Sequence, residues 1–295
     1  MTGRRGLVLG GGGVTGIAWM TGLLAGLAEA GTDLTTADMV VGTSAGSVVG
    51  AQILSGATLA ALYAAALTEP TGEVAAKMGV GVLFGFVVNS VWPGDERVGR
   101  ARLGRAAMRA RTVPEAERRE IIRQRLPNPS WPDHHLIITA VDAETGEARN
   151  FDRDSGVSLA DAVAASCAVP LVWPPITIDG RRYIDGGVRS ITNADLAGGC
   201  ERVVVVAPVT VALRRSGRIA SQLASLGPHV RSIVVSPDAN ARNAIGGNVL
   251  DPAHRVASAL AGYAQAAGVA AAVAAVWSGA WPGGRIEPPP VSTPP

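Results

Sequence analysis

The chain has 295 residues, of which 47% are hydrophobic and 17% are charged, and its formal net charge is +2. This length suits one large or two small domains with a sizeable core, and the composition excludes a disordered or fibrous chain. So small a net charge gives no support for a nucleic-acid partner. The two cysteines are too few for a disulfide framework, and no Cys/His spacing indicates a metal site, so we expect a cytoplasmic protein.

A glycine loop follows the first expected strand, residues 6–9. The loop ends in Gly11, Gly12 and Gly13, and a helix is expected from Gly16. Successive backbone N–H groups in such a loop can hold a phosphate or the oxyanion of a transition state. The glycine spacing also fits the dinucleotide-binding fingerprint. That fingerprint requires an acidic residue at the end of the second strand, whereas Asp38 begins it, so dinucleotide binding is the weaker alternative.

A serine occupies the turn between the second expected strand, residues 39–41, and the helix that follows. A serine at a sharp strand-to-helix turn needs small residues two positions away on either side, because the bent backbone crowds any larger side chain. Gly42 and Gly46 meet this need around Ser44. The pattern predicts a nucleophile elbow, with the Ser44 hydroxyl at a helix N-terminus, where the dipole favours developing negative charge.

Two segments that follow have unusual compositions. Residues 78–92 carry no charge and are too short to span a bilayer, which leaves a buried core segment or an apolar lid beside the site. Residues 97–125 are rich in arginine, which usually indicates a solvated helical face. The alternative hypothesis is peripheral contact with an anionic membrane through both segments. We expect a variable helical or lid insertion over about 69–132.

The later apolar runs predict further strands and one long helix. We expect strands at residues 136–142, 147–151, 176–178, 182–184, 203–207 and 232–235. Residues 255–280 are almost free of charge, but alanine and glycine are only weakly apolar, so a helix packed on the domain is expected rather than a membrane span. We predict a single domain over 1–281 and a proline-rich, disordered tail over 282–295.

An aspartate followed by two glycines, Asp185, Gly186 and Gly187, comes directly after one of these strands. Sites in open α/β sheets form at the carboxyl ends of parallel strands, so Asp185 shares an edge with Ser44 if its strand also runs parallel. The arrangement suits acyl transfer. Ser44 attacks a carbonyl, Asp185 accepts its proton, and the N–H groups of the glycine loop stabilise the oxyanion.

No histidine has a local context that would complete a Ser-His-Asp triad. An α/β-hydrolase places several strands before its nucleophile, whereas only one precedes the serine strand here. A Ser-Asp dyad is the alternative. A free carboxylate, with a pKa of about 3.9, is a poor base for a serine hydroxyl. Desolvation raises that pKa, and proton transfer can be concerted with attack.

Three motifs in this order resemble the patatin-like phospholipase family, and two further blocks agree with it. The motifs are residues 10–16, 42–46 and 185–187, and the blocks are 139–146 and 165–175. The resemblance implies a three-layer α/β/α fold with a mostly parallel central sheet and a Ser44–Asp185 dyad. It also implies hydrolysis of lipid acyl esters through an acyl-enzyme, without a metal or cofactor.

One residue departs from the family pattern. Thr15 stands just before the last glycine of the loop, where the family usually carries Arg or Lys. The backbone donors remain, but a positive charge near the oxyanion is missing. The leading hypothesis is a serine hydrolase of lipid or other acyl esters, of phospholipase A, lysophospholipase or esterase type. The alternatives are a catalytically silent lipid-binding relative and a dinucleotide-binding protein.

Overall fold

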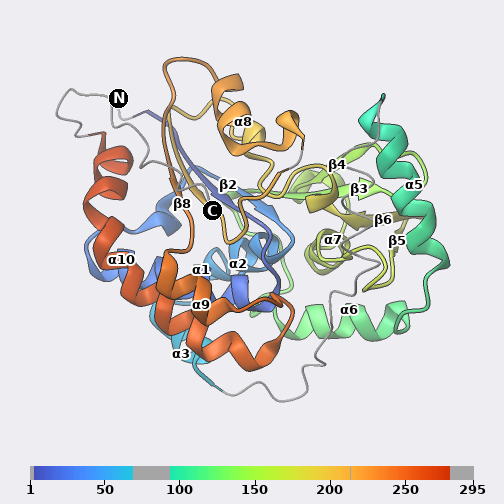
Figure 1. Cartoon of the computed structure of the whole chain (residues 1–295), viewed down its shortest axis with the longest axis horizontal. Helices are drawn as coiled ribbons and strands as arrows, with labels where there is room; N and C mark the ends of the chain where they lie inside the picture. Colours follow the sequence, from blue (N-terminus) through green and yellow to red (C-terminus); the bar gives the residue numbers. More distant parts are fainter. Residues whose placement is uncertain (1–2, 69–93, 213, 280–295) are drawn as a thin grey trace, which may run out of the picture.

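The computed structural model describes residues 3–68, 94–212 and 214–279. The uncharged segment 78–92 and the predicted tail 282–295 lie outside these residues. An eight-stranded sheet of order β5-β6-β3-β2-β1-β7-β8 runs through the molecule, and β4 pairs with β3 off this path (Figure 1). The strands are β1 (Arg5–Leu9), β2 (Met39–Thr43), β3 (His135–Asp142), β4 (Ala148–Phe151), β5 (Ile176–Ile178), β6 (Arg181–Asp185), β7 (Arg202–Val206) and β8 (Arg231–Val235).

The sheet has a parallel part and an antiparallel part. Strands β3, β2, β1, β7 and β8 pair in parallel, as expected for strands joined by helical crossovers. Strands β4 and β6 are antiparallel to β3, and β5 is antiparallel to β6. The expectation of a parallel aspartate strand is therefore wrong. Asp179 and Gly180 form a tight turn between β5 and β6, and so short a turn joins only antiparallel strands.

Helices cover both faces of the sheet, which makes the three-layer α/β/α fold (Figure 1). One face carries α1, α2, α7 and α10, and the other carries α5 and α8. The helices are α1 (Gly13–Glu29), α2 (Ala45–Ile53), α3 (Leu59–Ala66), α5 (Glu96–Arg109), α6 (Glu115–Gln124), α7 (Leu159–Ser166), α8 (Ile219–Ser225), α9 (Ala239–Ile245) and α10 (Arg255–Ser278).

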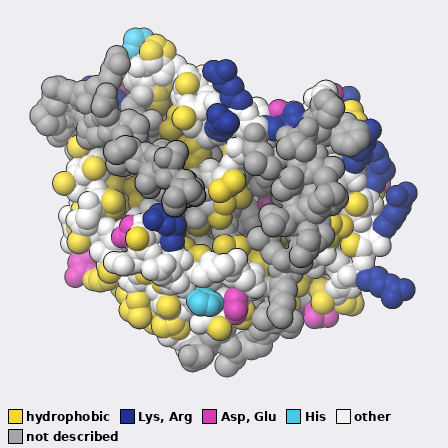
Figure 2. All heavy atoms as spheres, in the orientation of Figure 1, with side chains coloured by type: hydrophobic (Ala, Val, Ile, Leu, Met, Phe, Trp, Pro, Cys, Tyr) yellow, Lys and Arg dark blue, Asp and Glu magenta, His cyan; other side chains and the backbone are white. Residues whose placement is uncertain are grey.

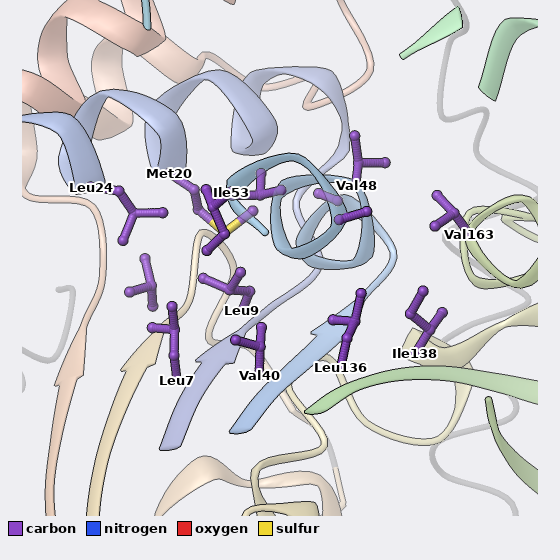
Figure 3. Close-up of a cluster of buried hydrophobic side chains, with 14 of the residues drawn as sticks. Leu7, Leu9, Met20, Leu24, Val40, Val48, Ile53, Leu136, Ile138 and Val163 are labelled. Carbon is purple, nitrogen blue, oxygen red and sulfur yellow. The ribbon is translucent and has the colours of Figure 1, made fainter. Parts of the chain in front are cut away.

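The hydrophobic core follows from the alternation of side chains along the strands. Leu7 and Leu9 of β1 point to the face that carries α1 and α2 and belong to one buried cluster with Met20 and Val48 (Figure 3). Val8 lies between them in the sequence and belongs to the cluster on the opposite face. Both clusters are fully buried at the central strands, so the near-continuous apolar runs are those of a parallel sheet covered on both sides.

Helix α1 begins one turn earlier than expected, at Gly13 instead of Gly16. Gly13 has a φ of 61°, in the left-handed region, and the Gly16 N–H donates to the Gly12 carbonyl at 2.8 Å. This hydrogen bond forms the first turn of α1, so the helix begins within the glycine loop. The loop therefore has no spacer before the helix, and its amides lie at the helix N-terminus.

Helix α10 is the one described helix that is long and apolar enough to cross a membrane by length and composition. It packs along α1 at close range. A Cβ atom added to Gly22 would lie 2.0 Å from the Ala259 carbonyl oxygen, and one added to Gly262 would lie 2.1 Å from that of Trp19. The Trp19 Nε1–H donates to Gln265 Oε1 at 3.0 Å. This helix thus forms part of the outer layer of the domain.

Candidate active site

Ser44 lies between β2 and α2 in a strained backbone conformation. Its φ is 52° and its ψ is −117°, a region that non-glycine residues rarely adopt. Its N–H donates to Ser166 Oγ at 2.9 Å, and its carbonyl accepts from Ser47 Oγ at 2.7 Å. The Cys167 thiol also donates to that carbonyl, at 3.3 Å. The end of α7 thus holds the strained peptide in place through Ser166 and Cys167.

The two elbow glycines are needed because backbone approaches them closely. A Cβ atom on Gly46 would lie 1.9 Å from the Leu9 carbonyl oxygen, and one on Gly42 would lie 2.6 Å from the Ser47 Cα atom. Real Cβ contacts are never this short, so both positions exclude any side chain. These approaches bring α2 against the end of β1, next to the glycine loop.

Asp185 reaches the same edge of the sheet from the opposite direction. The register pairs Thr43 with Thr139 in β3, and Ala140 with Asp185. Ser44 and Asp185 are therefore level with each other on the two sides of β3. Gly186 makes this possible, because a Cβ atom there would lie 2.2 Å from Thr139 Oγ1. The antiparallel strand thus delivers its aspartate to the position that a parallel strand was expected to supply.

The Asp185 carboxyl group is buried beside Ser44. Burial raises the pKa of Asp185 to about 6, although the Ser44 hydroxyl, the Gly187 N–H and the Arg118 charge all favour the ionised form. Oδ1 accepts from the Gly187 N–H at 2.7 Å, whereas Oδ2 has no hydrogen bond of standard geometry to any described residue. Catalytic hydrogen bonds are often long before substrate binds. Oδ2 is thus the carboxylate oxygen with room to take a proton.

The glycine loop lies against Ser44, but its amides differ in what they bind. The Gly11 N–H donates to the Ile191 carbonyl at 2.8 Å. Within the described part of the chain, the N–H groups of Gly12 and Gly13 have no hydrogen-bond partner. A Cβ atom on Gly11 would lie 3.6 Å from that of Ser44, so the loop and the elbow are in direct contact. Two amides beside the serine are open to an incoming oxygen atom.

Thr15 is buried, and its hydroxyl donates to the Val249 carbonyl at 3.2 Å. The loop therefore presents no charged side chain to Ser44.

A buried polar network behind the site was not foreseen from the sequence. Asn193 has a left-handed φ of 51°, and its amide donates to Thr43 Oγ1 at 3.0 Å and to the Ser190 carbonyl at 2.7 Å. The Thr43 and Thr139 hydroxyls lie 3.0 Å apart. This network joins the ends of β2 and β3 to the segment after Asp185. In the sequence, three polar residues stand at this segment, Ser190, Thr192 and Asn193, with Ile191 among them.

An apolar cleft of about 580 Å³, its mouth included, opens beside Ser44. Gly13, Val14 and Ile17 of α1 line one side, and Leu250 and Pro252 also contribute. A largely apolar lining with a few polar groups is typical of a small-molecule site.

Helix α6 lines the other side of the cleft with residues that the sequence did not mark as part of a site. Arg118, Ile121 and Arg125 face the cleft together with Trp173 and Cys167. Burial raises the pKa of Cys167 to about 11, so its thiol stays protonated at neutral pH and does not compete with Ser44. The arginine-rich run is thus only partly a solvated face, since Arg118 is 4% exposed. Arg118 lies within α6 and Arg125 is its C-cap residue, and no sequence signal separates these two arginines from their basic neighbours.

The remaining titratable candidates lie elsewhere. His134 and His135 are exposed, His254 Nδ1 bonds the Ala244 carbonyl at 3.0 Å, and none of these lines the cleft. Asp142 accepts from the N–H groups of Glu144 and Thr145, each at 2.9 Å, and is thus an Asx-turn residue. Among the described residues, no group of three or more His, Cys, Asp or Glu side chains has the arrangement of a metal site.

Two solved structures are similar to this chain at low sequence identity. VipD from Legionella pneumophila matches with a TM-score of 0.47 and 13% identity, over 92% of this chain and 67% of that one. The type III effector protein ExoU matches with a TM-score of 0.40 and 16% identity, over 92% of this chain and 53% of that one. No curated protein matches the chain.

The family model for patatin-like phospholipases matches residues 7–197, a span that contains the glycine loop, Ser44 and Asp185. This is well over half of the sequence, and the chain therefore belongs to the patatin-like phospholipase family.

Proposed function

We propose that this protein hydrolyses carboxylic esters of lipids with a Ser44–Asp185 dyad. The observation that carries the proposal is a serine in a strained elbow beside a buried carboxylate whose pKa is raised to about 6. A carboxylate with a pKa nearer to neutrality is a better base than a solvated one and remains mostly ionised at pH 7. Family membership supports a lipid hydrolase, and the apolar cleft suits an acyl chain.

The proposed reaction has two acyl-transfer steps. Ser44 Oγ attacks the ester carbonyl carbon as its proton passes to Asp185 Oδ2. The Gly12 and Gly13 N–H groups stabilise the oxyanion, and Gly11 holds the loop in place through Ile191. The tetrahedral intermediate expels the alcohol, which takes the proton from Asp185. Water then attacks the acyl-enzyme, again with Asp185 as base, and releases the acid and free Ser44.

Hydrolysis of p-nitrophenyl butyrate by the wild type, Ser44→Ala and Asp185→Asn tests the dyad. We expect Ser44→Ala to lower kcat by about 10⁴-fold or more and to abolish labelling by a fluorophosphonate. Asp185→Asn should lower kcat by about 10²–10⁴-fold, which is the usual contribution of a general base. The wild-type kcat/KM should fall as the pH drops through about 6, because Asp185 must be ionised to accept the proton.

The alternatives predict different results. A silent lipid-binding relative would bind fatty acyl chains but leave the ester intact and Ser44 unlabelled. A dinucleotide-binding protein would be stabilised thermally by nucleotide, and equally so in Ser44→Ala. Substantial activity in both dyad variants would exclude Ser44 and Asp185 as the catalytic pair.

We further propose that the protein is cytoplasmic and contacts membranes peripherally. Exposed arginines of α5 support the contact, and Figure 2 shows basic side chains along the edge where this helix lies. They include Arg97, Arg102, Arg105 and Arg109. Liposome co-sedimentation should increase with anionic lipid content and decrease with salt. Binding that responds to neither variable would contradict the proposal.

A further inference from the structure

A single side-chain amide lies between the strand ends that carry Ser44 and Asp185. The Asn193 Nδ2 atom lies 3.0 Å from Thr43 Oγ1 and 3.4 Å from the Gly186 carbonyl oxygen. Thr43 directly precedes Ser44 in the sequence, and Gly186 directly follows Asp185. The amide is therefore within hydrogen-bonding distance of a neighbour of the proposed nucleophile and of a neighbour of the proposed base.

The orientation of this amide follows from its surroundings. Its oxygen accepts from Arg189 Nη1 at 2.6 Å, and an arginine side chain can only donate. The other end of the amide faces the Ser190 carbonyl at 2.7 Å and the Gly186 carbonyl, so that end must be the nitrogen. Asn193 is fully buried, and its hydrogen bonds are therefore shielded from solvent.

Thr139 of β3 fills the space between the two strand ends. Its hydroxyl lies 3.0 Å from Thr43 Oγ1 and 3.3 Å from the Asn193 amide nitrogen. It also donates to the Gly42 carbonyl at 3.5 Å, and the Gly186 backbone packs directly against it. An amide nitrogen has only two hydrogens, which these acceptors share, so a shift of one partner changes the bonds to the others.

The segment that carries Asn193 is anchored from the α8 side of the sheet. Gln222 Oε1 accepts from Ser190 Oγ at 3.1 Å and from the Ala194 N–H at 3.0 Å. Asn193 itself has a left-handed φ of 51°, which asparagine tolerates better than most residues with a side chain. An anchored segment with a strained residue at this point holds the amide at a set position, which indicates a role beyond filling space.

The amide does not reach the cleft. Asn193 is not among the described residues that line it, whereas Ser44 is. Asn193 thus lies behind the reacting atoms and can influence them only through their position. Proton transfer within the dyad needs the two oxygen atoms within about 2.6–3.2 Å of each other, and a displacement of about 1 Å can cost about 10²-fold in rate.

We propose that Asn193 is a positioning residue that sets the separation between Ser44 and Asp185. It does so by bonding the residue before the nucleophile and the residue after the base. The inference rests on the proposed function, because it takes these two residues as the catalytic pair. Loss of the amide should lower kcat and leave KM nearly unchanged, since Asn193 does not line the cleft. A merely structural residue would lower stability and leave the folded protein fully active.

Asn193→Gly is the variant that removes the amide and keeps the left-handed backbone. With p-nitrophenyl butyrate as substrate, we expect kcat to fall about 10–100-fold and KM to stay within about twofold of the wild type. The acid limb of the kcat/KM profile should also move to higher pH. Burial raises the pKa of Asp185 and the Ser44 hydroxyl lowers it, so a displaced serine would leave this pKa higher.

Arg202→Met is the matched control for lost stability. Arg202 is 7% exposed and donates to the carbonyls of Gly3 and Trp277. It begins β7, which runs parallel to β1, so it lies at the edge of the sheet opposite to Ser44. This variant should be destabilised but keep kcat within about twofold of the wild type. A fall in kcat as large as that of Asn193→Gly would trace the loss to stability and overturn the positioning role.

Thr43→Val removes the same hydrogen bond from its other partner and keeps the branched shape of the side chain. We expect kcat to fall about tenfold, with KM unchanged. The double variant with Asn193→Gly should be within about twofold of the slower single variant, because both changes remove one interaction. Effects that multiply would overturn the proposal. If Asn193→Gly does not fold, kcat and KM of Thr43→Val decide alone.

Ser44→Ala and Asp185→Asn, assayed in the same series, separate this inference from the proposed function. Activity retained in both variants would overturn the dyad, and with it the need to position these two residues. Activity lost in both, with kcat unchanged in Asn193→Gly, would overturn only the positioning role. Activity lost in both, with a lower kcat and an unchanged KM in Asn193→Gly, is the result that we expect.

Discussion

The two walls of the Ser44 cleft are built in different ways. The elbow wall consists of residues 10–13 and 42–46 and presents mainly backbone to the cleft. Its geometry depends on glycines, because an added Cβ atom at these positions would lie at van der Waals contact with neighbouring atoms or closer. The α6 wall, formed by Arg118, Ile121 and Arg125, presents side chains to the cleft. Its helix is held by an ion pair to α7 and by a hydrogen bond to a backbone carbonyl of β5. The elbow wall thus leaves almost no room for added side-chain atoms, whereas the α6 wall depends on which side chains its helix carries.

The largest effect expected from breaking the elbow wall is that of Gly46→Ala. The new Cβ atom would lie 1.9 Å from the Leu9 carbonyl oxygen, so α2 must move away from β1. We expect a loss of at least about 3 kcal/mol in the free energy of unfolding, and loss of activity in any folded fraction.

The control is Gly268→Ala in α10, where a Cβ atom would meet nothing within 4 Å. Because alanine is the better helix former, that variant should gain about 0.5–1 kcal/mol. Denaturant titrations measure both, and similar values for the two would contradict the close approach at Gly46.

A smaller effect concerns the buried carboxylate that faces the elbow. The folded-state pKa of Asp185 is raised from 3.8 to about 6, so the folded state binds the proton more tightly than the unfolded state. The stability from this preference is complete below about pH 3.8 and is lost as the pH rises through about 6. Asp185→Asn should therefore be more stable than the wild type at pH 8, by up to about 3 kcal/mol.

The Asp185→Asn difference should shrink as the pH falls from 7 to 4. Urea titrations at pH 4.5, 6 and 8 measure it. A difference that is the same at all three values would mean that the folded protein does not perturb this carboxyl group.

The support of the elbow by α7 can be tested with two serines. Ser166→Ala removes the acceptor of the buried Ser44 N–H and should cost about 1–3 kcal/mol, the penalty for an unsatisfied buried donor. Ser47→Ala should cost less, because the Ser44 carbonyl also accepts from Cys167 and from the Ser47 N–H. Thermal unfolding and kcat for a short ester measure the pair. If Ser47→Ala were more destabilising than Ser166→Ala, the hydrogen bond to the Ser44 carbonyl would contribute more to stability than the one from the Ser44 N–H.

The smallest effect is expected from loosening the α6 wall. Arg119 pairs with Glu115 and Asp161, and its side chain is 21% exposed. Arg119→Met should cost about 1 kcal/mol or less, as is usual for partly exposed ion pairs. Hydrogen exchange should become faster in α6 but stay unchanged in α2, with KM affected more than kcat. Faster exchange in both helices would mean that the two walls are not independent.

The elbow wall could be predicted from the sequence because its signals are local. The glycine loop directly follows β1, and the turn that contains Gly42, Ser44 and Gly46 directly follows β2. These two strands pair with each other, so the loop and the turn lie side by side. The position of Asp185 was predicted, but the direction of its strand was not. The turn at residues 179–180 makes β5 and β6 antiparallel, so β6 enters the mostly parallel sheet in the opposite direction to β3.

The position of the α6 wall could not be predicted, because it depends on contacts between residues that are far apart in the sequence. Arg119 binds Asp161 of α7 and the carbonyl of Thr177 in β5. These contacts decide which of the arginines face solvent and which face Ser44. In the sequence alone, Arg118 and Arg125 are indistinguishable from their basic neighbours.

The close packing of α10 on α1 has a consequence for biosynthesis. Trp19 and Gln265 are 246 residues apart, yet they are hydrogen-bonded in the core, and α1 begins at the glycine loop. A nascent chain that has emerged only as far as β7 already contains the glycine loop and Ser44. The face of α1 that packs against α10 is then still uncovered. We therefore expect the glycine loop and Ser44 to reach their final arrangement only after α10 has left the ribosome, so partly made chains would lack a complete site.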